Sequence, residues 1–135
     1  MITGYEDITR ELSHRELNHY IPMLISGFRA KIGKENIVST HEIIEKIYKR
    51  EQKTNNKAVK LTEPRIRKMA AYIIMNDLVP CLISCRKGFY IATEPQEIDN
   101  EIRSLNDRMK AMHAKKTAWN RQKEKAFFEV KTLFE

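Results

Sequence analysis

Residues 61–92 narrow the possible folds of this chain more than any other stretch. Thr62, Glu63 and Pro64 are typical of a helix start, because threonine can cap, glutamate favours the positive end of the helix dipole and proline is tolerated in the first turn. Apolar residues then recur at the i, i+3, i+4, i+7 spacing of one helix face, at Ile66, Met69, Ala70 and Ile73. The sequence therefore predicts an amphipathic helix over residues 62–75.

A β-hairpin pattern follows this helix directly. The β-forming runs 82–84 and 89–91 flank a short link, residues 85–88, which ends in Gly88. Glycine supplies the positive φ that such a turn usually requires. A basic helix followed at once by a hairpin indicates a winged helix-turn-helix, in which the helix recognises DNA and the hairpin, residues 84–90, is the wing.

Helical patterns also precede this stretch. Ser13 and Glu16 match a capping box, in which the serine caps the helix and the glutamate returns to the backbone amide of the cap. We expect a break just before Pro22, because proline removes a hydrogen-bond donor and clashes with the preceding turn. A second helical piece is predicted over residues 22–31, with Gly33 as its natural stop.

A further helix is expected between these pieces and residue 61. Ser39 and Glu42 form a second capping box, and the turn residues 54–56 should end the helix near Lys53. Its apolar face consists of Ile43, Ile44, Ile47 and Tyr48. The fold class is therefore mainly α: a three-helix core plus a β-hairpin wing, with N-terminal helices and a long C-terminal helix. The expected divisions are an N-terminal helical segment that packs on the core (1–35), a winged-helix domain (36–93) and a C-terminal helix (94–135).

The C-terminal segment is predicted to be one long helix over residues 95–132, since Thr93, Pro95 and Gln96 repeat the pattern of a helix start. An apolar seam with the 4-3 spacing of a two-stranded coiled coil consists of Ile98, Ile102, Leu105, Met109 and Met112. Lysines fall at two later core positions, so the coil is interrupted there or the chain folds back. We expect a homodimer through this seam; a single helix packed on its own domain is the alternative.

Positive charge is concentrated in the middle of the chain. The net charge is +7 at pH 7, and residues 36–93 hold eleven lysines and arginines against five acidic residues. The segments on either side are nearly neutral. A local excess of this kind favours a polyanionic partner.

Several function classes are not expected. The sequence contains no motif of a hydrolase or metalloprotease and no phosphate-binding glycine loop, so we predict neither catalysis nor a cofactor nor a metal site. Cys81 and Cys85 are too far apart along one strand to bridge comfortably, which fits a reducing intracellular setting. No apolar run approaches the length of a membrane span and no signal peptide is visible, so we expect a cytoplasmic protein without membrane contact.

Duplex DNA is the partner that this pattern favours. A recognition helix leads into the major groove with its N-terminal residues, and the wing contacts the backbone or the minor groove. The expected DNA-binding residues are Lys57, Lys60, Thr62, Arg65, Arg67, Lys68, Tyr72, Arg86 and Lys87. The alternative is a winged-helix module that binds another protein and no nucleic acid, because a fold alone does not fix a function. Charge alone also does not distinguish duplex DNA from structured RNA.

Two short motifs strengthen this interpretation. R-I-R-K at residues 65–68 and K-G-F-Y-I-A at residues 87–92 resemble small winged-helix proteins of bacteriophages and prophages, in which a long coiled-coil helix closes the chain. Phe89 stands where such wings often have tyrosine. The resemblance implies a DNA-binding protein of phage replication or transcription control, and it carries over only to Arg65, Arg67, Lys68, Arg86 and Lys87. A twofold dimer would present two recognition helices to an inverted repeat.

Overall fold

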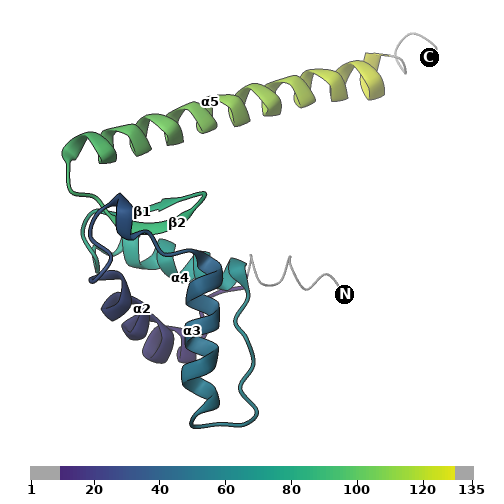
Figure 1. Cartoon of the computed structure of the whole chain (residues 1–135). Coiled ribbons are helices and arrows are strands. Elements are labelled where there is room, and N and C mark those ends of the chain that lie inside the picture. Colours follow the sequence, from purple (N-terminus) through teal and green to yellow (C-terminus); the bar gives the residue numbers. More distant parts are fainter. Residues whose placement is uncertain (1–9, 130–135) are drawn as a thin grey trace. The chain divides into compact units, whose positions relative to one another are not determined.

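A computed structural model describes residues 10–129 of the chain. The chain divides into two units after Pro95. The elements of the first unit are a π-helical turn (Glu16–Tyr20), α2 (Ile21–Phe28), a 3-10 turn (Lys34–Asn36), α3 (Thr40–Gln52), α4 (Glu63–Met75), β1 (Leu82–Cys85) and β2 (Gly88–Ile91). The second unit consists of α5 (Pro95–Glu124) and a π-helical turn (Lys125–Glu129). The fold is mainly helical with one small hairpin, as predicted (Figure 1).

The bounds of α3 and α4 agree with the predicted ones to within a residue or two. α3 begins directly after Ser39, whose Oγ accepts a hydrogen bond of 3.1 Å from the amide of Glu42. α4 begins directly after Thr62, with Pro64 in its first turn. The side chain of Thr62 makes no capping hydrogen bond, so this helix start depends on the proline and on Glu63 instead.

The first capping box is complete. The amide of Ser13 donates to Oε1 of Glu16 at 2.9 Å, and the amide of Glu16 donates to Oγ of Ser13 at 3.1 Å. The expected break before Pro22 is a change of winding rather than an interruption. The amide of Ile21 donates to the carbonyl of Glu16, five residues back, and the α-helix α2 starts there. The wider turn fits the missing amide hydrogen of proline.

The second predicted piece, residues 22–31, is too long. α2 ends at Phe28, and Gly33 is therefore not its stop. The carbonyl of Lys31 accepts a 2.7 Å hydrogen bond from the amide of Ile91, and the amide of Gly33 donates to the carbonyl of Ile91 at 2.8 Å. The chain leaves the helix because these backbone groups pair with β2.

The hairpin is antiparallel and closes through the two-residue turn 86–87, with Cys85 opposite Gly88. Val38 adds a third strand position, since its amide donates to Phe89 O at 3.0 Å and its carbonyl accepts from Phe89 N at 2.8 Å. Gly88 has φ +140°, and a Cβ there would clash with the carbonyl oxygen of Val38. Glycine is therefore needed for the close approach of two backbones as well as for the positive φ.

One apolar core joins α2, α3, α4 and the hairpin. The apolar face predicted for α4 is buried in full, and the rings of Phe28 and Phe89 lie 5.2 Å apart between their centroids. Side chains of α2 and of the turn before it belong to this core. Its buried members are Tyr20, Ile21, Leu24, Phe28, Val38, Ile43, Ile44, Ile47, Ile66, Met69, Ala70, Ile73, Val79, Leu82 and Phe89.

α5 is a continuous α-helix of 30 residues, about 45 Å long at 1.5 Å per residue. The predicted end at residue 132 lies outside the described residues. Within the predicted seam, Ile98 is half-buried, and four residues are between 50% and 62% exposed: Ile102, Leu105, Met109 and Met112. Among residues 10–129, no helix combines the length and the apolar character that crossing a membrane requires.

Candidate nucleic-acid interface

The hairpin turn carries two exposed cations of the predicted interface. Arg86 and Lys87 are both exposed at the junction of β1 and β2. Among the described residues, no carboxylate forms an ion pair with either side chain. An anionic ligand could therefore contact both side chains of this turn.

Four of the predicted residues lie at the outer surface of α4 or at its start. Arg67 is exposed and 3.7 Å from Glu63, one turn back, a separation at which such a pair contributes only tenths of a kcal/mol. Tyr72 is 38% exposed, Lys68 is half-buried, and Thr62 is exposed at the N-cap. These side chains provide one weakly paired guanidinium, one ammonium and two hydroxyls.

The two predicted lysines before α4 differ in their surroundings. Lys57 is exposed in the loop between α3 and α4. Lys60 donates to Oε1 of Glu45 at 2.6 Å, and its Nζ lies 5.3 Å from the ring centre of Tyr48. The hydrogen bond raises the pKa of Lys60 and lowers the pKa of Glu45. Lys60 is thus already paired within the fold, whereas Lys57 is available to a ligand.

Arg65 is buried inside the first unit, so the prediction that it contacts DNA is wrong. The residue is 2% exposed. Its Nη2 donates to Oε1 of Glu16 at 2.6 Å and its Nε to Oε2 at 2.9 Å, while Glu16 itself is 4% exposed. The same guanidinium donates to the carbonyls of Arg10 at 2.7 Å and Glu11 at 3.1 Å. Arg65 therefore ties α4 to the segment before α2.

Helical spacing contained a sign of this pair. Arg65 lies four residues before Met69 and eight before Ile73, so it shares their buried face. Glu16 likewise lies four residues before the buried Tyr20. A cation and a carboxylate that each continue an apolar stripe are expected to find each other, because an unpaired buried charge is very costly.

The environment of Glu16 favours its charged form. Burial alone would raise the pKa of this carboxyl. The hydrogen bonds from Arg65 and Ser13, together with the charge of Arg65, outweigh burial and lower the pKa to about 2. Glu16 is therefore a carboxylate at pH values well above 2.

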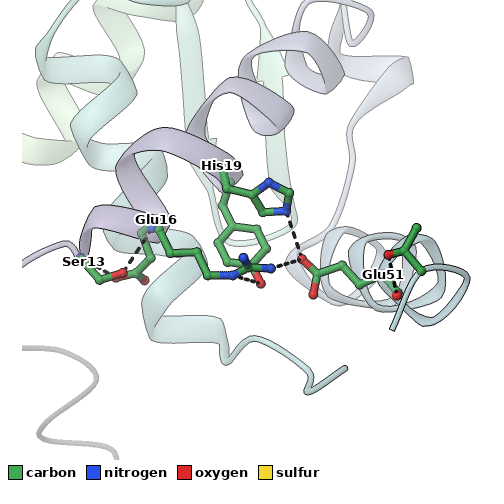
Figure 2. Close-up of polar contacts among 7 residues, drawn as sticks. Ser13, Glu16, His19 and Glu51 are labelled. Carbon is green, nitrogen blue, oxygen red and sulfur yellow. Dashed lines mark hydrogen bonds and ion pairs between the residues drawn. The ribbon is translucent and has the colours of Figure 1, made fainter. Parts of the chain in front are cut away.

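A second polar cluster joins the helix before α2 to the end of α3 (Figure 2). His19 points toward Glu51, with 3.2 Å between Nε2 and Oε1, and Nη2 of Arg15 lies 3.3 Å from the same oxygen. Nε of Arg15 also donates to the hydroxyl of Tyr20 at 3.4 Å, and burial raises the pKa of that hydroxyl. Each polar group has a partner inside the cluster, so the cluster stabilises the contact between these two helices.

Sequence reasoning missed two further cations. Arg10 and Arg15 line the same hollow of about 420 Å³ as Lys57, between the N-terminal segment and the loop before α4. Arg15 is paired with Glu51, whereas the side chain of Arg10 is exposed. Both precede the charged middle of the chain, so a count of charge by segment could not find them.

Metal-ligand chemistry is absent from this surface and from the rest of residues 10–129, where no three histidine, cysteine, aspartate or glutamate side chains gather as a metal site would require. Cys81 and Cys85 are free thiols.

Comparison of the chain with protein-family models, characterised proteins and solved structures found no match. The resemblance to phage winged-helix proteins thus rests on residues 65–68 and 87–92 alone, and the first residue of the first motif is buried.

Proposed function

We propose that this chain is a non-catalytic duplex-DNA-binding protein with a winged helix-turn-helix domain. The observation that carries the proposal is the pair of exposed cations, Arg86 and Lys87, at the turn of a hairpin that follows directly on an amphipathic basic helix. A phosphate backbone is the ligand that such a turn suits, because its charges are dense and need no precise fit. The expected cytoplasmic location accords with this role.

The order of elements supports a winged helix. α2, the strand position at Val38, α3, α4 and the hairpin follow one another along the chain and share one core. In this arrangement α4 is the recognition helix and the hairpin is the wing. The proposed DNA contacts are Lys57, Thr62, Arg67, Lys68, Tyr72, Arg86 and Lys87. Arg65 is buried against Glu16, and Lys60 is already paired with Glu45.

We further propose that α5 joins two copies of the chain as a coiled coil. Four large apolar side chains of its seam are at least half exposed at 4-3 spacing, and a second helix would cover them. Sedimentation equilibrium should then find a dimer, and Leu105→Lys should convert it to a monomer. A wild-type protein that sediments as a monomer at tens of micromolar would remove the dimer from the proposal.

Titration of labelled duplex DNA at several salt concentrations tests the DNA proposal. The logarithm of the affinity should fall linearly with the logarithm of the salt concentration between about 50 and 200 mM. The variant Arg86→Ala/Lys87→Ala should bind roughly tenfold more weakly, with a salt slope smaller by about 2, because two phosphate contacts are lost.

A matched control removes the same charge elsewhere. Arg29 and Arg108 are exposed, one in each unit and neither in the proposed interface, so Arg29→Ala/Arg108→Ala should bind like the wild type. Equal weakening of both variants would mean that only net charge matters. If no duplex DNA binds with salt-dependent affinity, the proposal fails, and a protein-interaction module becomes the better interpretation. If duplex DNA does bind, selection of bound sequences from random duplexes tests for an inverted repeat.

A further inference from the structure

An apolar groove of about 190 Å³ lies between α2 and α3. Its floor is formed by core side chains, among them Phe28, Val38 and Ile47. None of the residues that line it belongs to α4, β1 or β2. An occupant of this groove would therefore leave the proposed DNA contacts on α4 and the hairpin uncovered.

Three cations, Lys31, Lys46 and Arg50, line the groove around this apolar floor. Within residues 10–129, none of the three forms an ion pair. The contrast with Arg15 and Lys60 is informative, because those cations meet carboxylates of the same unit. Positive charge beside an apolar floor is complementary to a ligand that is apolar in the middle and acidic at its edges.

A glycine inside a helix leaves one edge of the groove open. Gly27 lines the groove in the last turn of α2, and a Cβ there would meet no atom within 4 Å. Glycine in a helix destabilises it by up to about 1 kcal/mol relative to alanine. Neither crowding nor a positive φ requires glycine at this place. The open space over Gly27 instead gives a ligand access to the floor.

We propose that this groove binds an acidic amphipathic helix of a partner protein. Two or three apolar side chains at i, i+3/i+4 spacing would enter the groove, and flanking carboxylates would pair with Lys31, Lys46 and Arg50. A nucleic-acid backbone has no apolar ridge to fill such a floor. The site goes beyond the proposed DNA binding, since it would bring a second protein to a chain bound on DNA.

Peptide selection on the full chain tests the proposal without knowledge of the partner. The probe is a random library of displayed peptides, each about four helical turns long. Enriched peptides should carry aspartate or glutamate beside apolar residues at helical spacing. They are then titrated against the wild type and the variants by fluorescence anisotropy, with circular dichroism as the check of folding.

Two pairs of variants locate the site. Gly27→Leu should fill the groove and abolish binding, whereas Gly27→Ala adds one methyl group and should bind like the wild type; both replacements favour the helix. Lys31→Glu/Lys46→Glu/Arg50→Glu should weaken binding about tenfold, because three exposed pairs become repulsive. The matched control makes the same change of charge on exposed residues outside the groove: Arg29→Glu/Lys49→Glu/Lys53→Glu.

The selection also has outcomes that overturn the proposal. No enrichment above background, or enrichment of basic or neutral peptides, would exclude an acidic helix as the ligand. Peptides that bind Gly27→Leu as tightly as the wild type would have a binding site outside the groove, which would contradict the proposal. If the charge reversal at Lys31, Lys46 and Arg50 abolishes duplex-DNA binding while the matched control does not, these cations belong to a DNA surface instead.

Discussion

Replacement of Arg65 by alanine should destabilise the first unit far more than the loss of an ordinary basic residue on a helix. The guanidinium donates to both carboxylate oxygens of Glu16 and to the carbonyl oxygens of Arg10 and Glu11. Alanine removes all four hydrogen bonds at once. It also leaves the carboxylate of Glu16, which is 4% exposed, without a cation.

The magnitude of this loss follows from the burial of the ion pair and from the pKa of Glu16. Breaking a buried ion pair by removal of one partner costs about 3–5 kcal/mol. The pKa of Glu16 is about 2 instead of 4.5, and this lowering, to which Arg65 and Ser13 both contribute, corresponds to about 3 kcal/mol of stabilisation of the charged form. A domain of this size has only about 5–15 kcal/mol of stability in total. Arg65→Ala should therefore remove a large part of it.

A double variant separates the buried charge from the lost packing. Arg65→Met/Glu16→Leu removes both charges and keeps most of the volume, and such replacements of buried pairs are often neutral or stabilising. The carbonyls of Arg10 and Glu11 lie in exposed residues, so water can replace the lost donors. The double variant should thus recover most of the stability that Arg65→Ala loses.

Urea unfolding followed by near-ultraviolet circular dichroism of the buried tyrosines, Tyr20 and Tyr90, is the appropriate assay. Fluorescence of Trp119 is unsuitable, because that residue is exposed in α5. A loss below about 1 kcal/mol, the value of an exposed ion pair, would refute the reasoning. So would a double variant as unstable as Arg65→Ala, since the cost would then come from packing.

Three shorter predictions concern the same unit. Because the pKa of Glu16 is lowered to about 2, its stabilising contribution should be full above pH 4.5 and be lost as pH falls toward 2; thermal unfolding of Glu16→Gln should not show this part of the decline. Asp77 has φ +57° just after α4, so Asp77→Gly should raise stability by about 0.5–1 kcal/mol, which an unchanged urea midpoint would contradict. Gly88→Ala should cost at least about 2 kcal/mol, because φ is +140° and the new Cβ meets Val38; a wild-type melting temperature would rule this out.

The parts of the fold that sequence predicted well are those determined within a few neighbouring residues. The cap at Ser39, the proline at position 64 and the turn at 86–87 each fix an element boundary locally, and the observed boundaries follow them. The apolar face of α4 was also predicted correctly, because four core residues repeat at helical spacing.

The parts that sequence missed depend on partners far along the chain. α2 stops at Phe28 because Lys31 and Gly33 pair with Ile91, about sixty residues later, and nothing near Phe28 announces this. The pairing of Lys60 with Glu45 is of the same kind. Local sequence patterns predict the type of an element, whereas tertiary hydrogen bonds and ion pairs determine where it ends.

Arg65 illustrates why a local count of charge overestimates an interface. The count of eleven basic residues against five acidic ones in residues 36–93 includes Arg65 without its partner, because Glu16 lies outside that segment. The helix face on which a cation lies decides whether it is structural or accessible to a ligand. A cation on the apolar face is buried and therefore needs a carboxylate partner in the core.

The burial of Arg65 also determines how this residue should affect DNA binding. Because it is buried, it acts on α4 only by holding the helix against the segment before α2. A folded Arg65→Met/Glu16→Leu protein should then bind duplex DNA with the affinity and the salt slope of the wild type. A slope reduced by about 1 in that folded protein would mean that Arg65 contacts a phosphate after all, and that the pair with Glu16 opens when DNA binds.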